Sequence, residues 1–115
     1  MNIKEVNGGV CAPKGFKANG VHCGIRKNKI KKDFALIVSD VMASAAGVYT
    51  SNLVKGAPVI VTKKHLTDGF AQAIIVNSGN ANTCNENGIE IAEGMCGMVE
   101  RVSGIPSGDV IVAST

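Results

Sequence analysis

The residues Ala73-Ile-Ile-Val76 form a continuous apolar run that leads directly into a polar segment, Asn77-Ser-Gly-Asn-Ala-Asn82. Two similar runs lie before and after it in the sequence, Ala35-Leu-Ile-Val38 and Val110-Ile-Val-Ala113. Apolar and polar residues do not alternate within these runs, which is typical of strands covered on both faces. The sequence therefore predicts central strands of a layered sheet over Ala35–Ser39, Ala73–Val76 and Val110–Ala113.

Further clusters of β-branched and apolar residues predict strands over Gly47–Thr50 and Pro58–Thr62. A short helical turn is expected over Thr62–Asp68, with Gly69 ending it. The predicted fold class is α/β or α+β, with layers of sheet and helix.

One long helix is predicted over Gly88–Val102. Its apolar residues recur at helical spacing and form a stripe that we assign to the core, with two methionines beside it: Ile89, Ala92, Cys96, Val99, Val102, Met95 and Met98. Gly94 and Gly97 lie inside this helix, where each glycine costs about 1 kcal/mol relative to alanine. Close packing against the sheet is the expected compensation.

The length of 115 residues allows one domain or part of one. A hydrophobic content of 45% is sufficient for a core, whereas an aromatic content of 3% argues against a base-stacking nucleic-acid platform. No apolar run is long enough to cross a membrane. Met1–Gly9 lacks the apolar stretch of a secretory signal, so a cytoplasmic location is expected.

The cysteines and histidines give little support for a metal or a catalytic triad. The four cysteines, Cys11, Cys23, Cys84 and Cys96, are expected to be buried thiols rather than disulfides. Zinc ligation favours closely spaced pairs, which are absent, and His22 beside Cys23 is only a weak hint. Neither His22 nor His65 lies in a recognisable Ser/His/Asp arrangement. No metal site is predicted.

The charges are unevenly distributed along the chain. Residues 1–32 hold eight Lys and Arg and one Glu, a net charge of +7, whereas residues 33–115 hold four against eight, a net charge of −4. Most of the positive charge lies in the cluster Arg26–Lys32, which could bind phosphate or nucleic acid. We favour a solvated hairpin loop between the apolar segments Val21–Ile25 and Phe34–Ser39.

The polar segment Asn77–Asn82 is the first that suggests chemistry, because sites gather at strand ends in layered folds. Its amides and hydroxyl could hold an anion or position a carbonyl group. Alternatively, the Asn side chains satisfy their own backbone and cap the following turn. The sequence leaves both interpretations open.

Several motifs in order resemble the N-terminal part of the ornithine acetyltransferase family, also called glutamate N-acetyltransferase, of arginine biosynthesis. The resemblance covers about Gly9 to Thr115 and rests on the following segments: Ala12-Pro-Lys-Gly-Phe16, Gly20-Val21, Gly24-Ile25, Ala45-Ala-Gly-Val-Tyr-Thr-Ser-Asn52, Lys55-Gly-Ala-Pro-Val59, Asn77-Ser-Gly-Asn-Ala-Asn82 and Val110-Ile-Val-Ala-Ser-Thr115. It implies a sheet-and-helix sandwich of the ornithine acetyltransferase type, of which this chain is an N-terminal fragment.

The resemblance implies an enzyme that moves an acetyl group from N-acetylornithine to glutamate through an acetyl-threonine intermediate. In some family members acetyl-CoA is also a donor, and no other cofactor is implied. The family precursor cleaves itself into an α and a β chain, and the threonine at the new β N-terminus is the nucleophile, with the freed amine as its base. A heterotetramer of two α and two β chains is therefore expected, without a nucleic-acid or membrane partner.

Thr115 is the one catalytic residue that the resemblance assigns. It matches the threonine of the family's Ser-Thr-Gly motif, which stabilises the tetrahedral oxyanion together with the glycine that follows. The resemblance places that glycine, the nucleophile and the substrate-contacting residues beyond residue 115, so substrate-binding residues stay unassigned here. Asn77–Asn82 is expected to be a structural loop near the site.

We therefore expect residues 1–115 to be part of one domain of an α chain, inactive alone. Because Val110–Ala113 is predicted as a central strand, it should expose an unpaired edge in the isolated chain. The chain alone should therefore be poorly soluble or associate. Two alternatives stay open: a related self-cleaving aminopeptidase, and a noncatalytic module that binds anions or nucleic acid through Arg26–Lys32.

Overall fold

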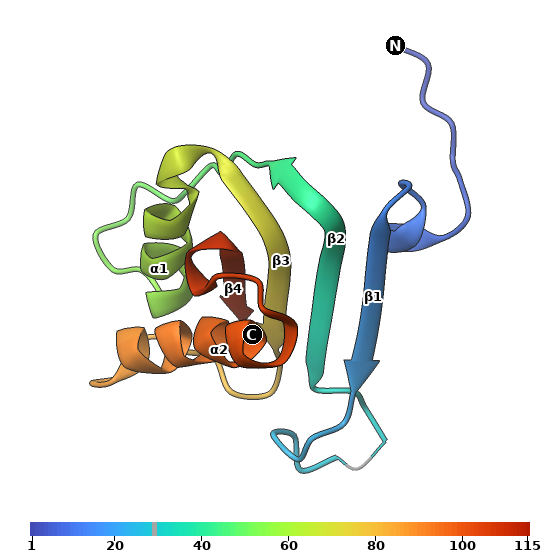
Figure 1. The fold of residues 1–115 in the computed structure, drawn as a ribbon. Helices are drawn as coiled ribbons and strands as arrows, with labels where there is room; N and C mark the ends of the chain where they lie inside the picture. Colours follow the sequence, from blue (N-terminus) through green and yellow to red (C-terminus); the bar gives the residue numbers. More distant parts are fainter. Residues whose placement is uncertain (29) are drawn as a thin grey trace.

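A four-stranded sheet forms the centre of the protein in the computed structural model, which describes residues 1–28 and 30–115 (Figure 1). The strands lie side by side in the order β1 (Phe16–Val21), β2 (Phe34–Ser44), β3 (Phe70–Asn77) and β4 (Val110–Ser114). β2 is antiparallel to both of its neighbours, and β3 and β4 are parallel.

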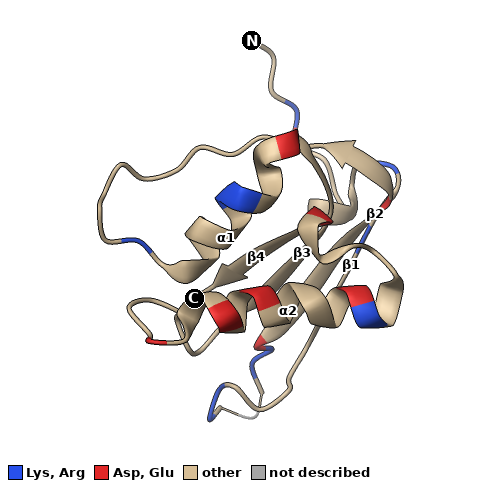
Figure 2. Ribbon diagram, turned by 60° about the vertical axis from the view of Figure 1, so that its left-hand side comes forward, with Lys and Arg blue, Asp and Glu red and all other residues tan. Residues whose placement is uncertain are grey.

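Two helices, α1 (Ala57–His65) and α2 (Gly88–Ser103), pack on the same face of the sheet (Figures 1 and 2). Short 3₁₀ turns lie at Gly9–Cys11, Leu66–Asp68 and Ser107–Asp109. The predicted layering of sheet and helix is confirmed. No helix in the described part of the chain has the length and apolar character needed to cross a membrane.

The core lies between this face of the sheet and the two helices. It is built from small and aliphatic side chains: Ala57, Val61, Ala73, Ile75, Ala92, Cys96, Val99, Ile105, Val110 and Val112. On β3, buried residues alternate with half-buried ones, so the described residues cover only one face of this strand. The prediction that this strand is covered on both faces is therefore not met by the described residues. The other face of the sheet is nevertheless apolar, because Ile37, Ile74 and Ile111 lie side by side on three neighbouring strands.

The crossover from β3 through α2 to β4 is the part of the fold that the sequence predicts best. α2 begins at Gly88 as predicted, and it ends at Ser103 because Gly104 adopts a left-handed conformation (φ +77°) and donates to the carbonyl of Glu100 at 2.8 Å. The middle of the predicted stripe is buried. At its two ends, however, Ile89 is 50% exposed and Val102 is 82% exposed.

The prediction that Pro58–Thr62 is a strand is wrong, because this segment lies in α1. Pro58 occupies the first turn of the helix, where its missing N–H costs nothing, and three basic residues end it at the negative end of the helix dipole: Lys63, Lys64 and His65. These signals at the two ends of the helix, together with the burial of Val61, outweigh the β propensity of Val59, Ile60 and Val61. The helical turn predicted at Thr62–Asp68 is the end of α1 followed by the 3₁₀ turn, and Gly69 follows in a left-handed conformation.

The predicted strand Gly47–Thr50 is also wrong: it lies in the irregular connection between β2 and α1. The predicted hairpin exists, but its first arm is β1 (Phe16–Val21) rather than Val21–Ile25. β1 is an edge strand with polar residues at Lys17 and Asn19, so it lacks the apolar run that marks the other strands.

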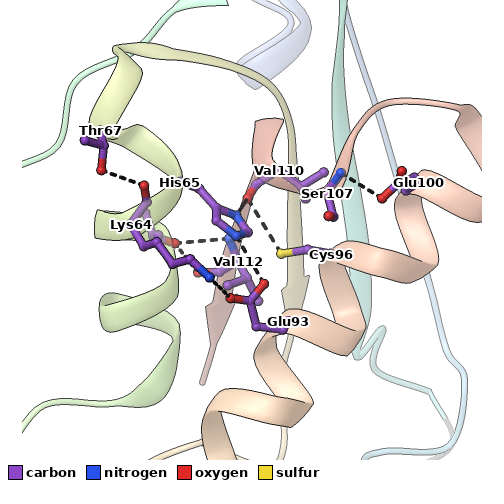
Figure 3. A network of polar contacts seen from close by, with 10 residues as sticks. Lys64, His65, Thr67, Glu93, Cys96, Glu100, Ser107, Val110 and Val112 are labelled. Atoms are coloured by element: carbon purple, nitrogen blue, oxygen red, sulfur yellow. Dashed lines mark hydrogen bonds and ion pairs between the residues drawn. The ribbon is translucent and has the colours of Figure 1, made fainter.

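β4 lies at the edge of the sheet rather than in its centre, and side chains of α1 cover its outer edge. The hydroxyl of Thr62 donates to the carbonyl of Val112 at 3.0 Å and accepts from its N–H at 3.2 Å. His65 Nδ1 lies 2.8 Å from the carbonyl oxygen of Val110 (Figure 3). The outward-facing backbone groups of these two residues therefore have partners, and the expectation of an open edge is wrong for this stretch.

A polar network continues from His65 to α2. His65 Nε2 lies 3.2 Å from Glu93 Oε2, and Lys64 Nζ lies 2.9 Å from Glu93 Oε1 (Figure 3). The hydrogen bond from Lys64 lowers the pKa of Glu93, aided by the nearby His65, while partial burial opposes this. The network ties α1, α2 and β4 together at one end of the core.

The prediction that the cysteines are buried thiols holds for one of the four. All four are free, but Cys11, Cys23 and Cys84 are exposed. Cys96 is buried in α2, where burial, together with the charge of Glu93, raises its pKa to about 11. Cys96 is therefore an unreactive core thiol.

Glycines in α2 give a first testable prediction. The expectation of close packing at Gly94 is wrong, since a Cβ there would meet nothing within 4 Å, whereas at Gly88 it would lie 2.7 Å from Asn82 Oδ1 and 3.1 Å from Ala57 Cβ. Gly94→Ala should therefore raise the free energy of unfolding by about 1 kcal/mol. Gly88→Ala should lower it by about 1–3 kcal/mol. Denaturant unfolding of both variants tests this, and equal effects would contradict it.

Thr62 gives a second prediction. Thr62→Val keeps the shape of the side chain but leaves the buried N–H and carbonyl of Val112 without their partner on α1. We expect the free energy of unfolding to fall by about 1–3 kcal/mol. Thr67→Val is the matched control, because the hydroxyl of Thr67 bonds to exposed carbonyls of its own turn. If both variants unfold at the same denaturant concentration as the wild type, Thr62 does not stabilise the edge of β4.

Candidate functional site

The candidate site lies where β3 and β4 end, and Thr115 is at its centre. The N–H of Thr115 donates to the carbonyl of Asn77 at 3.0 Å, and the carbonyl of Thr115 accepts from the N–H of Gly79 at 2.7 Å. These bonds continue the parallel pairing beyond the last residue of β4. The structure thus places the polar segment Asn77–Asn82 directly beside Thr115, whose side chain is exposed.

Asn77 and Asn82 shape this loop through their side chains. Asn77 accepts from the hydroxyl of Ser114 and donates to the carbonyl of Asn80 at 3.0 Å. The buried Asn82 donates to the carbonyl of Gly88 at 2.7 Å and accepts from the amide of Asn85 at 3.0 Å. Of the two interpretations that the sequence leaves open, these contacts support the one in which the Asn side chains satisfy nearby backbone.

Asp33 fixes the loop between β1 and β2, and sequence reasoning missed it. Its buried carboxylate accepts from the backbone N–H groups of Cys23 at 2.7 Å and Arg26 at 2.9 Å, and His22 Nδ1 lies 3.1 Å away. Burial opposes ionisation, but the hydrogen bonds from the loop, aided by His22, hold the pKa of Asp33 well below its usual range. The only signal in the sequence is that this lone acid ends a basic cluster.

Asp33 also connects its loop to the site. Its carbonyl oxygen accepts from the N–H of Ser78 at 2.9 Å, and its own N–H donates to Val21 at 2.9 Å. The loop between β1 and β2 therefore rests on the end of β3, next to the residues that hold Thr115.

The basic cluster Arg26–Lys32 lies in this hairpin loop, as predicted (Figure 2). Lys27, Lys31 and Lys32 are exposed, and Lys29 lies outside the described residues. Arg26 differs from them: it is half-buried, and its Nη2 donates to the hydroxyl of Ser78. The loop is thus a solvated hairpin end except at Arg26, which points to the candidate site.

A cavity of about 390 Å³ lies beside the polar loop, and Phe34, Asn80, Met95 and Ser114 contribute to its wall. Its lining is mostly apolar, and asparagine residues of the polar loop contribute to it. Within residues 1–28 and 30–115, no grouping of three or more His, Cys, Asp or Glu could hold a metal ion. The two histidines serve the fold: His22 contacts Asp33, and His65 contacts Val110 and Glu93.

The fold and the loop at the strand ends define a sheet-and-helix sandwich of the ornithine acetyltransferase type. The ArgJ crystal structure from Bacillus halodurans superimposes with a TM-score of 0.85 at 40% identity, over 93% of this chain and 56% of that one. Ornithine acetyltransferase from Mycobacterium tuberculosis, crystallised with ornithine, gives a TM-score of 0.81 at 34% identity, over 92% of this chain and 58% of that one.

Residues 17–115 match the ArgJ family, and the chain belongs to it. The bifunctional arginine-biosynthesis protein ArgJ of Caldanaerobacter subterraneus subsp. tengcongensis is 48% identical over 98% of this chain. The protein of the same name from Symbiobacterium thermophilum is 47% identical over 94% of it. The chain spans only 28% and 27% of the length of these relatives. The resemblance found in the sequence is therefore confirmed at the level of the family.

Asp33 gives a prediction on pH dependence. Its pKa is lower in the folded than in the unfolded chain, so it stabilises the fold above the unfolded value of about 3.9, and this contribution is lost as the pH falls below that value. Asp33→Asn should lower the melting temperature at neutral pH and flatten its decline in acid.

The matched control is Asp40→Asn, which removes an exposed carboxylate that pairs with Lys17 at 2.9 Å. It should leave the melting temperature nearly unchanged, because exposed ion pairs contribute little. Thermal melts of the wild type and both variants across the acid range provide the measurement. An Asp33→Asn variant with the melting curve of the wild type at every pH would refute the role of this carboxylate.

Proposed function

We propose that this chain is the N-terminal part of the α chain of an acetyltransferase of arginine biosynthesis. The enzyme transfers an acetyl group from N-acetylornithine to glutamate. Membership of the ArgJ family supports this proposal, as do the names of its relatives. Because those relatives are called bifunctional, we propose that acetyl-CoA is a second acetyl donor.

The anchoring of Thr115 is the observation that carries the proposed chemistry. Hydrogen bonds to Asn77 and Gly79 fix both its N–H and its carbonyl group at the end of the parallel pair β3 and β4. The hydroxyl of a residue whose backbone is fixed in this way can donate to an oxygen whose negative charge develops during acyl transfer. We assign Thr115 to the oxyanion site, in agreement with its place in the Ser-Thr motif.

In the proposed reaction a threonine of the β chain attacks the acetyl carbonyl carbon, and its proton passes to the freed α-amine. The carbonyl electron pair moves onto the oxygen, where the hydroxyl of Thr115 stabilises the charge. Collapse of this intermediate breaks the amide C–N bond, and the protonated α-amine returns its proton to the departing ornithine amine, which leaves an acetyl-threonine ester. The amine of glutamate then attacks the ester carbonyl carbon, the ester C–O bond breaks, and N-acetylglutamate leaves as the threonine hydroxyl recovers a proton. The proposed assembly is a heterotetramer of two α and two β chains, formed by self-cleavage in the cytoplasm.

Thr115→Ala in the self-cleaved, full-length enzyme tests this assignment. Loss of one oxyanion donor should lower kcat by about 100- to 1000-fold and change KM much less, because the contact strengthens only in the transition state. Thr115→Ser keeps the hydroxyl and should retain most of the activity. Steady-state transfer to glutamate, measured with N-acetylornithine and with acetyl-CoA, is the readout.

A thermal melt of each variant separates catalysis from folding. If Thr115→Ala keeps kcat within about threefold of the wild type while its melting temperature drops, Thr115 is a structural strand-end residue. The assignment to the oxyanion site would then be wrong.

A further inference from the structure

Among the basic residues described in the β1–β2 loop, Arg26 is the one whose side chain contacts the polar loop Asn77–Asn82. Its Nη2 donates to the hydroxyl of Ser78, and the next residue, Gly79, donates its N–H to the carbonyl of Thr115 at 2.7 Å. One side chain of the β1–β2 loop is thus joined to Thr115 through two consecutive residues of the polar loop.

The fold holds Arg26 in this place from two sides. The carboxylate of Asp33 accepts from its backbone N–H at 2.9 Å. On the other side, the stem of Arg26 lies against Gly79, where a Cβ would stand 2.5 Å from Arg26 Cγ. Gly79 also has a φ of +103°, which only glycine adopts readily. The polar loop therefore leaves room for this arginine.

The guanidinium of Arg26 forms no ion pair with an acidic group among residues 1–28 and 30–115. No carboxylate of this part of the chain lies within ion-pair distance of the guanidinium, and Nε is buried without a hydrogen-bond partner. Burying part of an unpaired cation destabilises a fold. A neutral glutamine could donate to Ser78 at a smaller desolvation cost, so the contact alone does not account for a positive charge here.

We infer that Arg26 is a positioning residue for acyl transfer, which fixes Ser78 and Gly79 against Thr115 and keeps a positive charge near the end of β4. This inference rests on the proposed function, since the negative charge it would face is the oxyanion that Thr115 stabilises. A fixed cation beside a developing anion acts in the transition state more than in the ground state.

The test uses the self-cleaved, full-length enzyme with Arg26→Gln, Arg26→Lys and the neighbouring control Lys27→Gln. Arg26→Gln should lower kcat about 10- to 100-fold, because it removes the positive charge near the developing oxyanion, with KM within about twofold. Arg26→Lys should recover much of the loss, because it restores the charge without the planar fork. Lys27→Gln should behave as the wild type, since Lys27 is exposed.

A double-variant cycle with Thr115→Ala shows whether Arg26 acts through Thr115. In the Thr115→Ala background, Arg26→Gln should lower kcat by a clearly smaller factor than in the wild type, because the hydroxyl that Arg26 positions is absent. Fully additive losses in kcat would overturn the inference. The inference is also overturned if Arg26→Gln raises KM or lowers the melting temperature without lowering kcat. That result is expected if a carboxylate elsewhere in the full-length protein pairs with Arg26.

The two proposals fail in different ways. Normal turnover of Thr115→Ala refutes the oxyanion assignment, whatever Arg26→Gln does. Strongly reduced turnover of Thr115→Ala beside normal turnover of Arg26→Gln leaves the proposed function intact and refutes only the role of Arg26.

Discussion

The parallel pairing of β3 with β4 is the constraint on which the other contacts depend. Parallel neighbours need a crossover, and α2 provides it while burying Ala92, Cys96 and Val99 on the sheet. The pairing leaves the outer backbone groups of β4 facing α1, where Thr62 and His65 bond to them. It also brings the ends of both strands to the same edge of the sheet. The position of Thr115 beside the polar loop thus follows from the topology.

Backbone groups, more than side chains, hold the candidate site together. The N–H and carbonyl of Thr115 are both bonded to the polar loop, and the N–H of Ser78 is bonded to the carbonyl of Asp33. Such bonds persist through side-chain substitution, so the loop can keep its shape while the side chains around it vary. The exception is the Asp33 carboxylate, since a neutral replacement at this buried position would leave two N–H groups with a weaker acceptor.

Local patterns predicted the elements whose own sequence determines them. α2 was predictable because its apolar stripe is long, and β2, β3 and β4 because their apolar runs are continuous. α1 was not, because the β-branched residues from Val59 to Thr62 favour a strand and only Pro58 and the basic end of the segment indicate a helix. The motif at Thr115 was found through a family resemblance. The contacts of Asp33 and Arg26 lie within the hairpin loop and with the polar loop after β3, and no local pattern encodes them.

The body of the fold and the candidate site differ in how their polar groups are satisfied. In the body of the fold, the core side chains are aliphatic and the outer edge of β4 has side-chain partners. Beside the ends of β3 and β4, by contrast, the buried Nε of Arg26 has no hydrogen-bond partner among the described residues. Natural folds commonly tolerate such costs where function needs them and offset them elsewhere. The β3–α2–β4 unit, which is held by the core and by the pairing of β3 with β4, provides that offset here and keeps the strand ends in register.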